Sequence, residues 1–229
     1  MLLTEDRNGR TPFSWAARRG HIRAVEMLLE RKEVIPDTLD ELGQRPLLWE
    51  AGNGHGGIVK MLLERKDIAP DTTAKGDRIP VSCAAGNRHE GIVKTLLERD
   101  DVTSDTADET GRTPLSWAAG GGCKDTVKML LKQEYVTPDT ADKGGRTPLS
   151  WGAGNNHLGI VKMLLKRENV ALDTVDNEGR TPLSLAAERG YTRIVEIFEN
   201  GAALAKISQL QTSPAQHFHT LLRSNMGEL

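Results

Sequence analysis

Short stretches with apolar residues at helical spacing alternate with polar turns along the whole chain. The pattern has a period of 34 residues, because a Thr-Pro pair or a substituted form of it falls at residues 11, 45, 79, 113, 147 and 181. A fixed period of 20–50 residues is typical of solenoids and other repeat architectures. The sequence therefore predicts six successive copies of one structural unit.

Each unit begins with a stretch that predicts a short helix. In the fourth unit, Leu115, Ala118 and Ala119 are spaced i, i+3 and i+4, which places them on one helical face. Thr113 is suited to cap this helix, and Pro114 has the backbone angle that the first helical position requires. Three consecutive glycines at 120–122 end the helix.

A second helix and a turn complete the unit. Apolar residues at 126, 127, 130 and 131 predict a helix over residues 124–133. The following residues are rich in Pro, Asp and Gly, and an Asp-x-x-Gly turn such as Asp142 to Gly145 precedes the next helix. One unit of this kind cannot bury its apolar face alone, so stacked neighbours must cover it.

Composition narrows the function classes. The net charge is -2 and the pI is about 6.3, so no basic footprint for nucleic acid is present. The sequence has no apolar run of about 18 residues or more and no pattern of a secretory signal at its start. The two cysteines stand at different places in their units and form no framework of bridges or metal ligands. We therefore expect a cytoplasmic protein, with a nuclear location also compatible, that does not bind membranes.

The repeated motif Gly-Arg-Thr-Pro-Leu-x-x-Ala-Ala resembles the ankyrin repeat, as do the Ile-Val-Lys-Met-Leu-Leu runs at 58–63 and 160–165. The resemblance implies an all-α ankyrin-repeat solenoid of helix-turn-helix units with short β-hairpin-like finger turns. The Ser-Trp variant of the motif is similar to ankyrin arrays of fungal multidomain proteins, including NLR-type receptors. The predicted units are 9–42, 43–76, 77–110, 111–144, 145–178 and 179–204, preceded by a partial unit at 1–8 and followed by a tail at 205–229 that has room for a short helix.

Two departures from the ankyrin pattern bear on structure. The histidine that the family usually carries after Thr-Pro-Leu is replaced, most often by serine as at Ser116, so its hydrogen bond is either lost or remade by the serine hydroxyl. In the sixth unit Glu199 replaces the second leucine of the Leu-Leu pair, and charged residues surround it. A polar outer face on the last repeat is what a terminal cap requires.

Histidines recur at one position of the unit, at residues 21, 55, 89 and 157. Helices in contact lie roughly 8–10 Å apart, too far for histidines of adjacent units to share a metal with bonds of about 2 Å. We expect these histidines to bond to a neighbouring loop instead. No catalytic constellation and no phosphate-binding loop can be assembled, so neither an enzyme nor a cofactor or metal site is predicted.

The four tryptophans occupy one position of the unit, away from the main apolar face. Trp117 shares a helical face with the glycines three and four residues later, and the ankyrin resemblance places that face in the concave groove. Two interpretations stay open: a row of indoles exposed to a partner, or indoles wedged between adjacent first helices with only an edge exposed. We favour the second.

An arginine precedes Thr-Pro in five units, and Gln44 interrupts the series. The resemblance places this position on the binding side, near the finger turns. Solvated pairs with the turn aspartates, worth about 0–1 kcal/mol each, and a row that binds acidic or planar partner groups are equally compatible with the pattern.

The third unit departs most from the repeated motif. Its turn at residues 74–77 lacks Asp-x-x-Gly, Ile79 replaces the capping threonine, and Cys83 replaces tryptophan. Loss of such a cap costs about 1 kcal/mol. We predict a weak joint over residues 74–90, which hydrogen exchange against residues 108–124 would test.

Together these patterns predict a monomeric, non-catalytic module that binds a protein partner through a concave surface. The alternative is an ankyrin arm of a larger multidomain, NLR-like sensor that packs on its own chain. The residues expected to contact the partner are Arg10, Arg18, Arg19, Gln44, Asn53, Lys75, Arg78, Asn87, Glu109, Arg112, Trp117, Lys143, Arg146, Trp151, Asn155 and Arg180.

Overall fold

The computed structural model of the chain describes residues 6, 10–40, 43–71 and 78–200. In these residues the secondary structure is helical, without a β-strand, as the sequence predicts. The helices are α1 (Pro12–Arg18), α2 (Ile22–Leu29), α3 (Pro46–Asn53), α4 (Gly56–Leu63), α5 (Pro80–Gly86), α6 (Glu90–Leu97), α7 (Pro114–Gly121), α8 (Lys124–Leu130), α9 (Pro148–Gly154), α10 (Leu158–Leu164) and α11 (Pro182–Glu188), and residues 192–200 are also helical.

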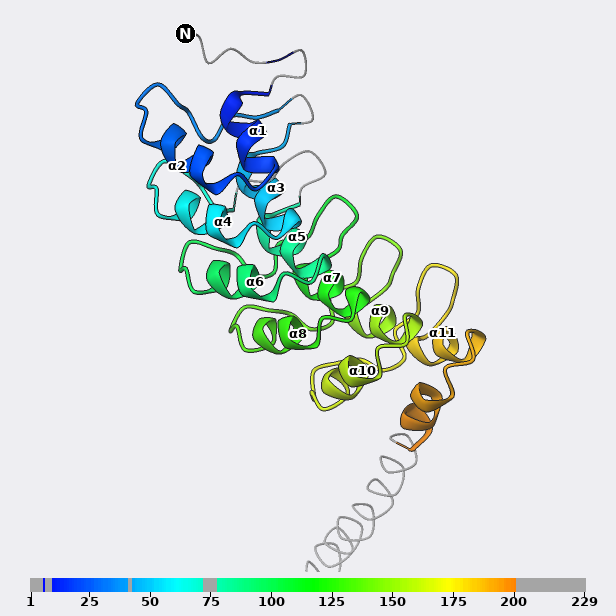
Figure 1. Cartoon of the computed structure of the whole chain (residues 1–229). Helices are drawn as coiled ribbons and strands as arrows, with labels where there is room; N and C mark the ends of the chain where they lie inside the picture. The colour runs from blue at the N-terminus through cyan, green and yellow to red at the C-terminus, as the bar shows by residue number, and fades with distance from the viewer. Residues whose placement is uncertain (1–5, 7–9, 41–42, 72–77, 201–229) are drawn as a thin grey trace, which may run out of the picture.

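The helices form two parallel rows in chain order (Figure 1). Odd-numbered helices pack on the next odd-numbered helix from α1 to α11, and even-numbered helices do the same from α2 to α10. The helices of each pair also pack on one another. This is the solenoid expected from the repeat, in which each pair buries its apolar face against the pairs before and after it.

The first helix of each pair starts as the motif predicts. Pro114 is the first helical residue of α7, and the Thr113 hydroxyl accepts a hydrogen bond from the backbone N–H of Ser116 at 3.3 Å. The Ser116 and Thr113 hydroxyls lie 3.3 Å apart in the buried interior. Serine therefore makes a local bond within its own unit at the position where the ankyrin family usually has histidine.

The second helices are shorter than predicted. Helix α8 ends at Leu130, so the predicted end at residue 133 is wrong. The N–H groups of Lys132 and Gln133 bond to carbonyls three residues earlier, which tightens the chain into turns after Leu130. Arginines of the following unit satisfy carbonyls that such helix ends leave open: Arg99 donates to the Leu63 carbonyl at 2.7 Å.

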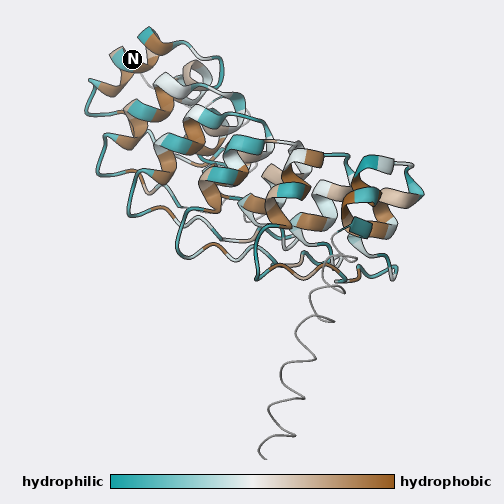
Figure 2. Ribbon diagram, turned by 90° about the horizontal axis from the view of Figure 1, so that it is seen from below, coloured by the Kyte–Doolittle hydropathy of each residue, from teal (hydrophilic) through white to brown (hydrophobic). Residues whose placement is uncertain are grey.

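A continuous apolar core runs between the two rows. Leu115, Ala118 and Ala119 on α7 are completely buried, and so are Val127 and Leu130 on α8. Hydrophobic and hydrophilic residues lie on different sides of the helices (Figure 2). Because burying a leucine or valine side chain contributes about 1.5–3 kcal/mol, the repeated small and large apolar positions supply most of the stabilisation.

The Asp-x-x-Gly turns form the finger loops beside the odd-numbered row (Figure 1). In the turn between the fourth and fifth units the Asp142 N–H bonds to the Arg146 carbonyl at 2.9 Å, and the Gly145 N–H bonds to the Asp142 carbonyl at 2.8 Å. Gly145 has a φ of +77°, which glycine adopts without a Cβ penalty. Successive fingers are joined because the Lys143 N–H bonds to the Thr110 carbonyl at 2.9 Å. The result is a hairpin-like turn held at a fixed distance from its neighbours.

The third unit lacks its threonine cap. Ile79 stands at the N-cap of α5 without a side-chain hydrogen bond, and its side chain is buried. The buried Ser82 hydroxyl, which would pair with a threonine at 79, has no hydrogen-bond partner. The missing bond and the unpaired hydroxyl both support a weak joint, which stays a prediction. Arg45 likewise fails to cap α3, a second departure that the sequence interpretation overlooked.

The last described helices carry the polar outer face that the sequence predicts. Glu188, Arg189, Arg193, Glu196 and Glu199 are all exposed. The predicted tail at 205–229 and the partial unit at 1–8, apart from Asp6, lie outside the described residues. The unit boundaries proposed from the sequence stay a prediction.

Candidate functional site

The four tryptophans are held by the aspartates of the finger turns. Each indole N–H donates to the aspartate nine residues earlier: Trp15 to Asp6 at 2.9 Å, Trp49 to Asp40 at 3.0 Å, Trp117 to Asp108 at 2.9 Å and Trp151 to Asp142 at 2.9 Å. A tryptophan side chain needs a partner for its N–H while its ring packs on apolar groups. The Asp-x-x-Gly turn therefore orients the indole as well as reversing the chain.

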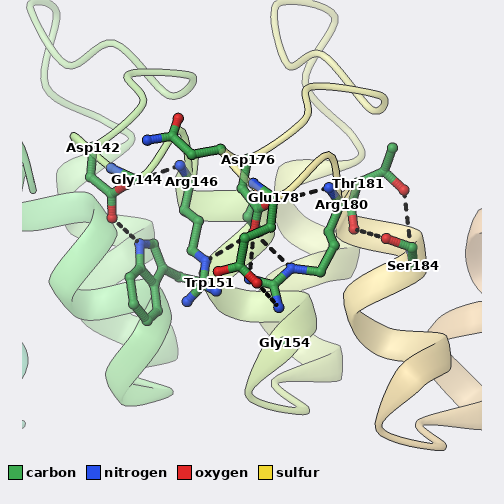
Figure 3. Close-up of polar contacts among 12 residues, drawn as sticks. Asp142, Gly144, Arg146, Trp151, Gly154, Asp176, Glu178, Arg180, Thr181 and Ser184 are labelled. Carbon is green, nitrogen blue, oxygen red and sulfur yellow. Dashed lines mark hydrogen bonds and ion pairs between the residues drawn. The ribbon is translucent and has the colours of Figure 1, made fainter.

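The other carboxylate oxygen of the same aspartate closes the turn. In the turn between the fourth and fifth units Asp142 Oδ1 accepts from the N–H groups of Gly144 and Arg146, both at 2.9 Å (Figure 3). Asp108 makes the equivalent bonds to Thr110 and Arg112. Burial acts to raise the pKa of Asp108, but these hydrogen bonds and that of Trp117 outweigh it and hold the pKa below its ordinary value. The Asp108 carboxylate is therefore ionised, and both of its oxygens are engaged in hydrogen bonds within the turn and to the indole.

The indoles of Trp117 and Trp151 pack against the first helix of the preceding unit. A Cβ added at Gly120 would lie 3.6 Å from Cε3 of Trp151, and one added at Gly86 would lie 3.2 Å from Cε3 of Trp117. The glycines that the sequence places beside a tryptophan thus accommodate the indole of the next unit. Trp117 and Trp151 are half-buried, whereas Trp15 is 36% exposed. This packing corresponds to the second interpretation, in which the indoles are wedged between adjacent first helices. An edge of each half-buried indole remains exposed.

Arginines cover the exposed faces of the indoles. The Arg112 guanidinium lies between two tryptophans, 4.7 Å from the ring centroid of Trp117 and 3.7 Å from that of Trp151. Arg146 lies 5.1 Å from the centroid of Trp151. In the first units Arg10 and Arg19 both lie 5.2 Å from Trp15, and Arg18 lies 4.2 Å from Trp49. We call these stacked side chains, Arg10, Arg18, Arg19, Arg112 and Arg146 with the four tryptophans, the Arg–Trp row.

The row changes where tryptophan is absent. In the sixth unit Leu185 replaces tryptophan, and Asp176 instead accepts from Arg180 at 2.9 and 3.1 Å and from Arg146 at 3.3 Å (Figure 3). Burial opposes ionisation of Asp176, yet these bonds lower its pKa strongly. In the third unit Cys83 replaces tryptophan, and burial raises the pKa of its thiol. A thiol with a raised pKa is a poor nucleophile, which fits a packing role.

The predicted partner residues differ in their exposure to solvent. Those at the surface are Arg19, Asn53, Arg78, Asn87, Glu109 and Lys143, and those partly covered are Arg10, Arg18, Gln44, Arg112, Trp117, Arg146, Trp151, Asn155 and Arg180. Lys75 lies outside the described residues.

Several of these residues have a structural contact of their own. The side-chain amides of Asn87 and Asn155 donate to the carbonyls of Gly52 and Gly120 in the preceding unit, at 2.8 and 2.9 Å. Arg180 is paired with Glu178 at 2.7 Å in addition to Asp176. The asparagines join adjacent helices, so their contribution to a binding surface is secondary to that role.

Two of the repeated histidines join neighbouring units, but they bond to the end of a helix and not to a loop, so the predicted loop contact is wrong for them. His89 bonds to the Gly52 carbonyl at 3.1 Å, and His157 bonds to the Gly120 carbonyl at 3.0 Å. Both carbonyls lie near the end of the first helix of the preceding unit. In the fourth unit Cys123 takes the histidine position and its Sγ bonds to the Ala85 carbonyl. Within the described part of the chain, no three His, Cys, Asp or Glu side chains are grouped to hold a metal ion.

One ionisable residue was missed in the sequence. Glu50 stands on α3 where the other units have alanine or glycine, and it is completely buried. One carboxylate oxygen lies 2.6 Å from His55 Nδ1, and the other has no hydrogen-bond partner. Burial raises the pKa of Glu50 to about 7, with the His55 hydrogen bond opposing the shift. The signal available in the sequence was that Glu50 replaces the small residue found at this position in the other units.

The sequence pattern of the family described as ankyrin repeats (3 copies) matches this chain at residues 2–75, 67–142 and 134–206. The chain therefore belongs to the ankyrin-repeat family. Ankyrin repeats generally serve as protein–protein interaction modules and are typically non-catalytic. A comparison with curated proteins gives no match. No helix in the described ranges is both long and apolar enough to cross a membrane.

Proposed function

We propose that this chain is a non-catalytic protein-binding module, and that its contact surface consists of the Arg–Trp row and the finger turns beside it. The observation that supports this most directly is Arg112. Its guanidinium is stacked between two indoles, lies 3.6 Å from the Asp142 carboxylate, and makes no side-chain hydrogen bond with the described residues. An immobilised guanidinium with free donors is suited to a partner, since little side-chain entropy is lost on binding.

The scaffold behind this surface is fixed in the units that carry a tryptophan. The inward aspartates fix the tryptophans, the tryptophans position the arginines, and the bonds between successive fingers keep the units in register. Such a surface presents its side chains without rearrangement, which is the usual condition for binding by repeat proteins.

The test is a selection from a random peptide display library on the full chain, followed by affinity measurements with two variants. The variant Arg112→Ala/Arg146→Ala removes two charges from the Arg–Trp row. The control Lys60→Ala/Lys128→Ala removes two exposed charges from α4 and α8 in the other row of helices. Thermal unfolding establishes that both variants fold.

We expect the first variant to weaken binding of the selected peptides about tenfold or more, and the control to bind like the parent. Peptides that keep their affinity for the first variant and lose it for the control would place the binding surface on the second helices. That outcome would overturn the proposal.

A further inference from the structure

We propose that the third to fifth units bind an extended acidic segment of a partner protein, with one carboxylate side chain at every third residue. The groups that would bind it are Arg78, Arg112 and Arg146, which we call the guanidinium row. The inference rests on the proposed protein-binding function and specifies the chemistry of the partner.

Arg112 is the central member of the row and the most constrained. It is stacked between Trp117 and Trp151, and its nearest described carboxylate oxygen, on Asp142, lies 3.6 Å from its Nε. Its buried Nε has no hydrogen-bond partner. Because Nε is buried and the side chain as a whole is 26% exposed, the two terminal nitrogens are the donors left for a bidentate pair with a partner's carboxylate.

The flanking members leave donors available as well. Arg78 is exposed and makes no ion pair or hydrogen bond with any described residue. Arg146 uses its Nε for Asp176 at 3.3 Å. The row thus contains three guanidinium groups on successive units, of which the first two lack a hydrogen-bonded carboxylate.

Asp142 pairs with Arg112 at 3.6 Å and Asp176 pairs with Arg146 at 3.3 Å, but these carboxylates are only 6% and 1% exposed, whereas the two arginine side chains are 26% and 24% exposed. Asp108 is buried as well, and like Asp142 it accepts an indole N–H and backbone N–H groups. The exposed charges at the two fingertips, Glu109 and Lys143, are of opposite sign. The charge left facing a partner is therefore that of the guanidinium groups, which favours an acidic ligand.

The repeat sets the spacing of the ligand. Packed helices lie roughly 8–10 Å apart, so equivalent arginines of adjacent units are separated by about that distance. A segment in the extended polyproline II conformation has three residues per turn and advances about 3.1 Å per residue, so residues three apart lie on the same side and about 9 Å from one another. A segment along the row would present acidic side chains at positions 1, 4 and 7 to the three arginines.

A protein segment fits this surface better than a single-stranded nucleic acid. Proteins that bind single strands stack the bases on open aromatic faces. Here guanidinium groups and the preceding helix cover the faces of Trp117 and Trp151. Carboxylate recognition needs only the outward edge of each arginine, which the stacking leaves free.

The experiment compares two fluorescein-labelled peptides of identical composition with the full chain by fluorescence anisotropy. The first is Glu-Ser-Ala-Glu-Ser-Ala-Glu, and the second is Glu-Glu-Glu-Ser-Ala-Ser-Ala; both carry the same Gly-Ser flanks. The protein variants are Arg112→Gln, Arg112→Lys and, as a control on the exposed face of α2, Arg23→Gln. Thermal unfolding of each variant shows whether it is folded.

We expect the spaced peptide to bind at least about tenfold more tightly than the clustered one, and Arg112→Gln to remove most of that difference. Arg112→Lys should also weaken binding, because lysine cannot form the bidentate pair, whereas Arg23→Gln should not. Equal binding of the two peptides, or binding insensitive to Arg112→Gln, would overturn the inference.

The library selection separates this inference from the proposed function. Peptides that depend on Arg112 and Arg146 but lack acidic residues at three-residue spacing would contradict the inference and leave the proposed function standing. Selected peptides that bind independently of both arginines would contradict both.

Discussion

The buried Glu50 makes a sharp prediction about stability and pH. Its pKa is raised from 4.5 to about 7 in the folded protein, mainly by burial. The folded state therefore holds the Glu50 proton more tightly than the unfolded state does. This contribution is fully present below about pH 4.5 and is lost as the pH rises through 7.

The magnitude follows from the two pKa values. One pKa unit corresponds to about 1.4 kcal/mol, so the whole contribution is about 3 kcal/mol, of which about 2.5 kcal/mol disappears between pH 5 and pH 8. The isosteric variant Glu50→Gln does not titrate, and its amide keeps a polar group beside His55. In the parent the Glu50 carboxylate lies 2.6 Å from His55 Nδ1. The difference in free energy of unfolding between parent and variant reports the Glu50–His55 pair as a unit, because the two groups are coupled.

The assay is urea unfolding at pH 5, 6, 7 and 8, followed by tryptophan fluorescence. Relative to Glu50→Gln, the parent should lose about 2.5 kcal/mol between pH 5 and pH 8. The control Glu26→Gln, at an exposed position of α2, should show no such change relative to the parent. If the difference between parent and Glu50→Gln is the same at pH 5 and pH 8, the burial argument is wrong.

Three further predictions concern packing and the third unit. Ser82→Ala should leave the free energy of unfolding unchanged or raise it by up to about 1 kcal/mol, because the buried hydroxyl has no hydrogen-bond partner. Ser116→Ala should lower it by about 1 kcal/mol, because the hydroxyl bonds to Thr113; urea unfolding compares the two variants. Gly120→Ala should stabilise by about 0.5–1 kcal/mol in the same assay, since its Cβ meets Trp151 at an ordinary contact distance, and Gly122→Ala, at a φ of +77°, should destabilise by more than about 1 kcal/mol. Amides of α5 should exchange faster than those of α7 in hydrogen-exchange measurements; equal protection would refute the weak joint.

The sequence by itself determined the architecture. The period of 34 residues and the spacing of Leu115, Ala118 and Ala119 were sufficient to predict paired helices stacked in a solenoid. The reason is that repeated units contact only their neighbours, so the local pattern of one unit, copied along the chain, contains nearly all of the long-range packing. The threonine cap and the proline at the first helical position are equally local, and both were confirmed.

Tertiary structure decided how the candidate site is built. The motif places tryptophan and aspartate nine residues apart, but only folding of the finger onto the helix makes the indole N–H bond to Asp142. Likewise, the stacking of Arg112 on Trp151 joins two units, and no pattern within one unit contains it. Glu50 shows the same division: its sequence position is that of a small core residue, while its burial and its bond to His55 follow from the packing of neighbouring helices, which sets the dielectric and hence the pKa.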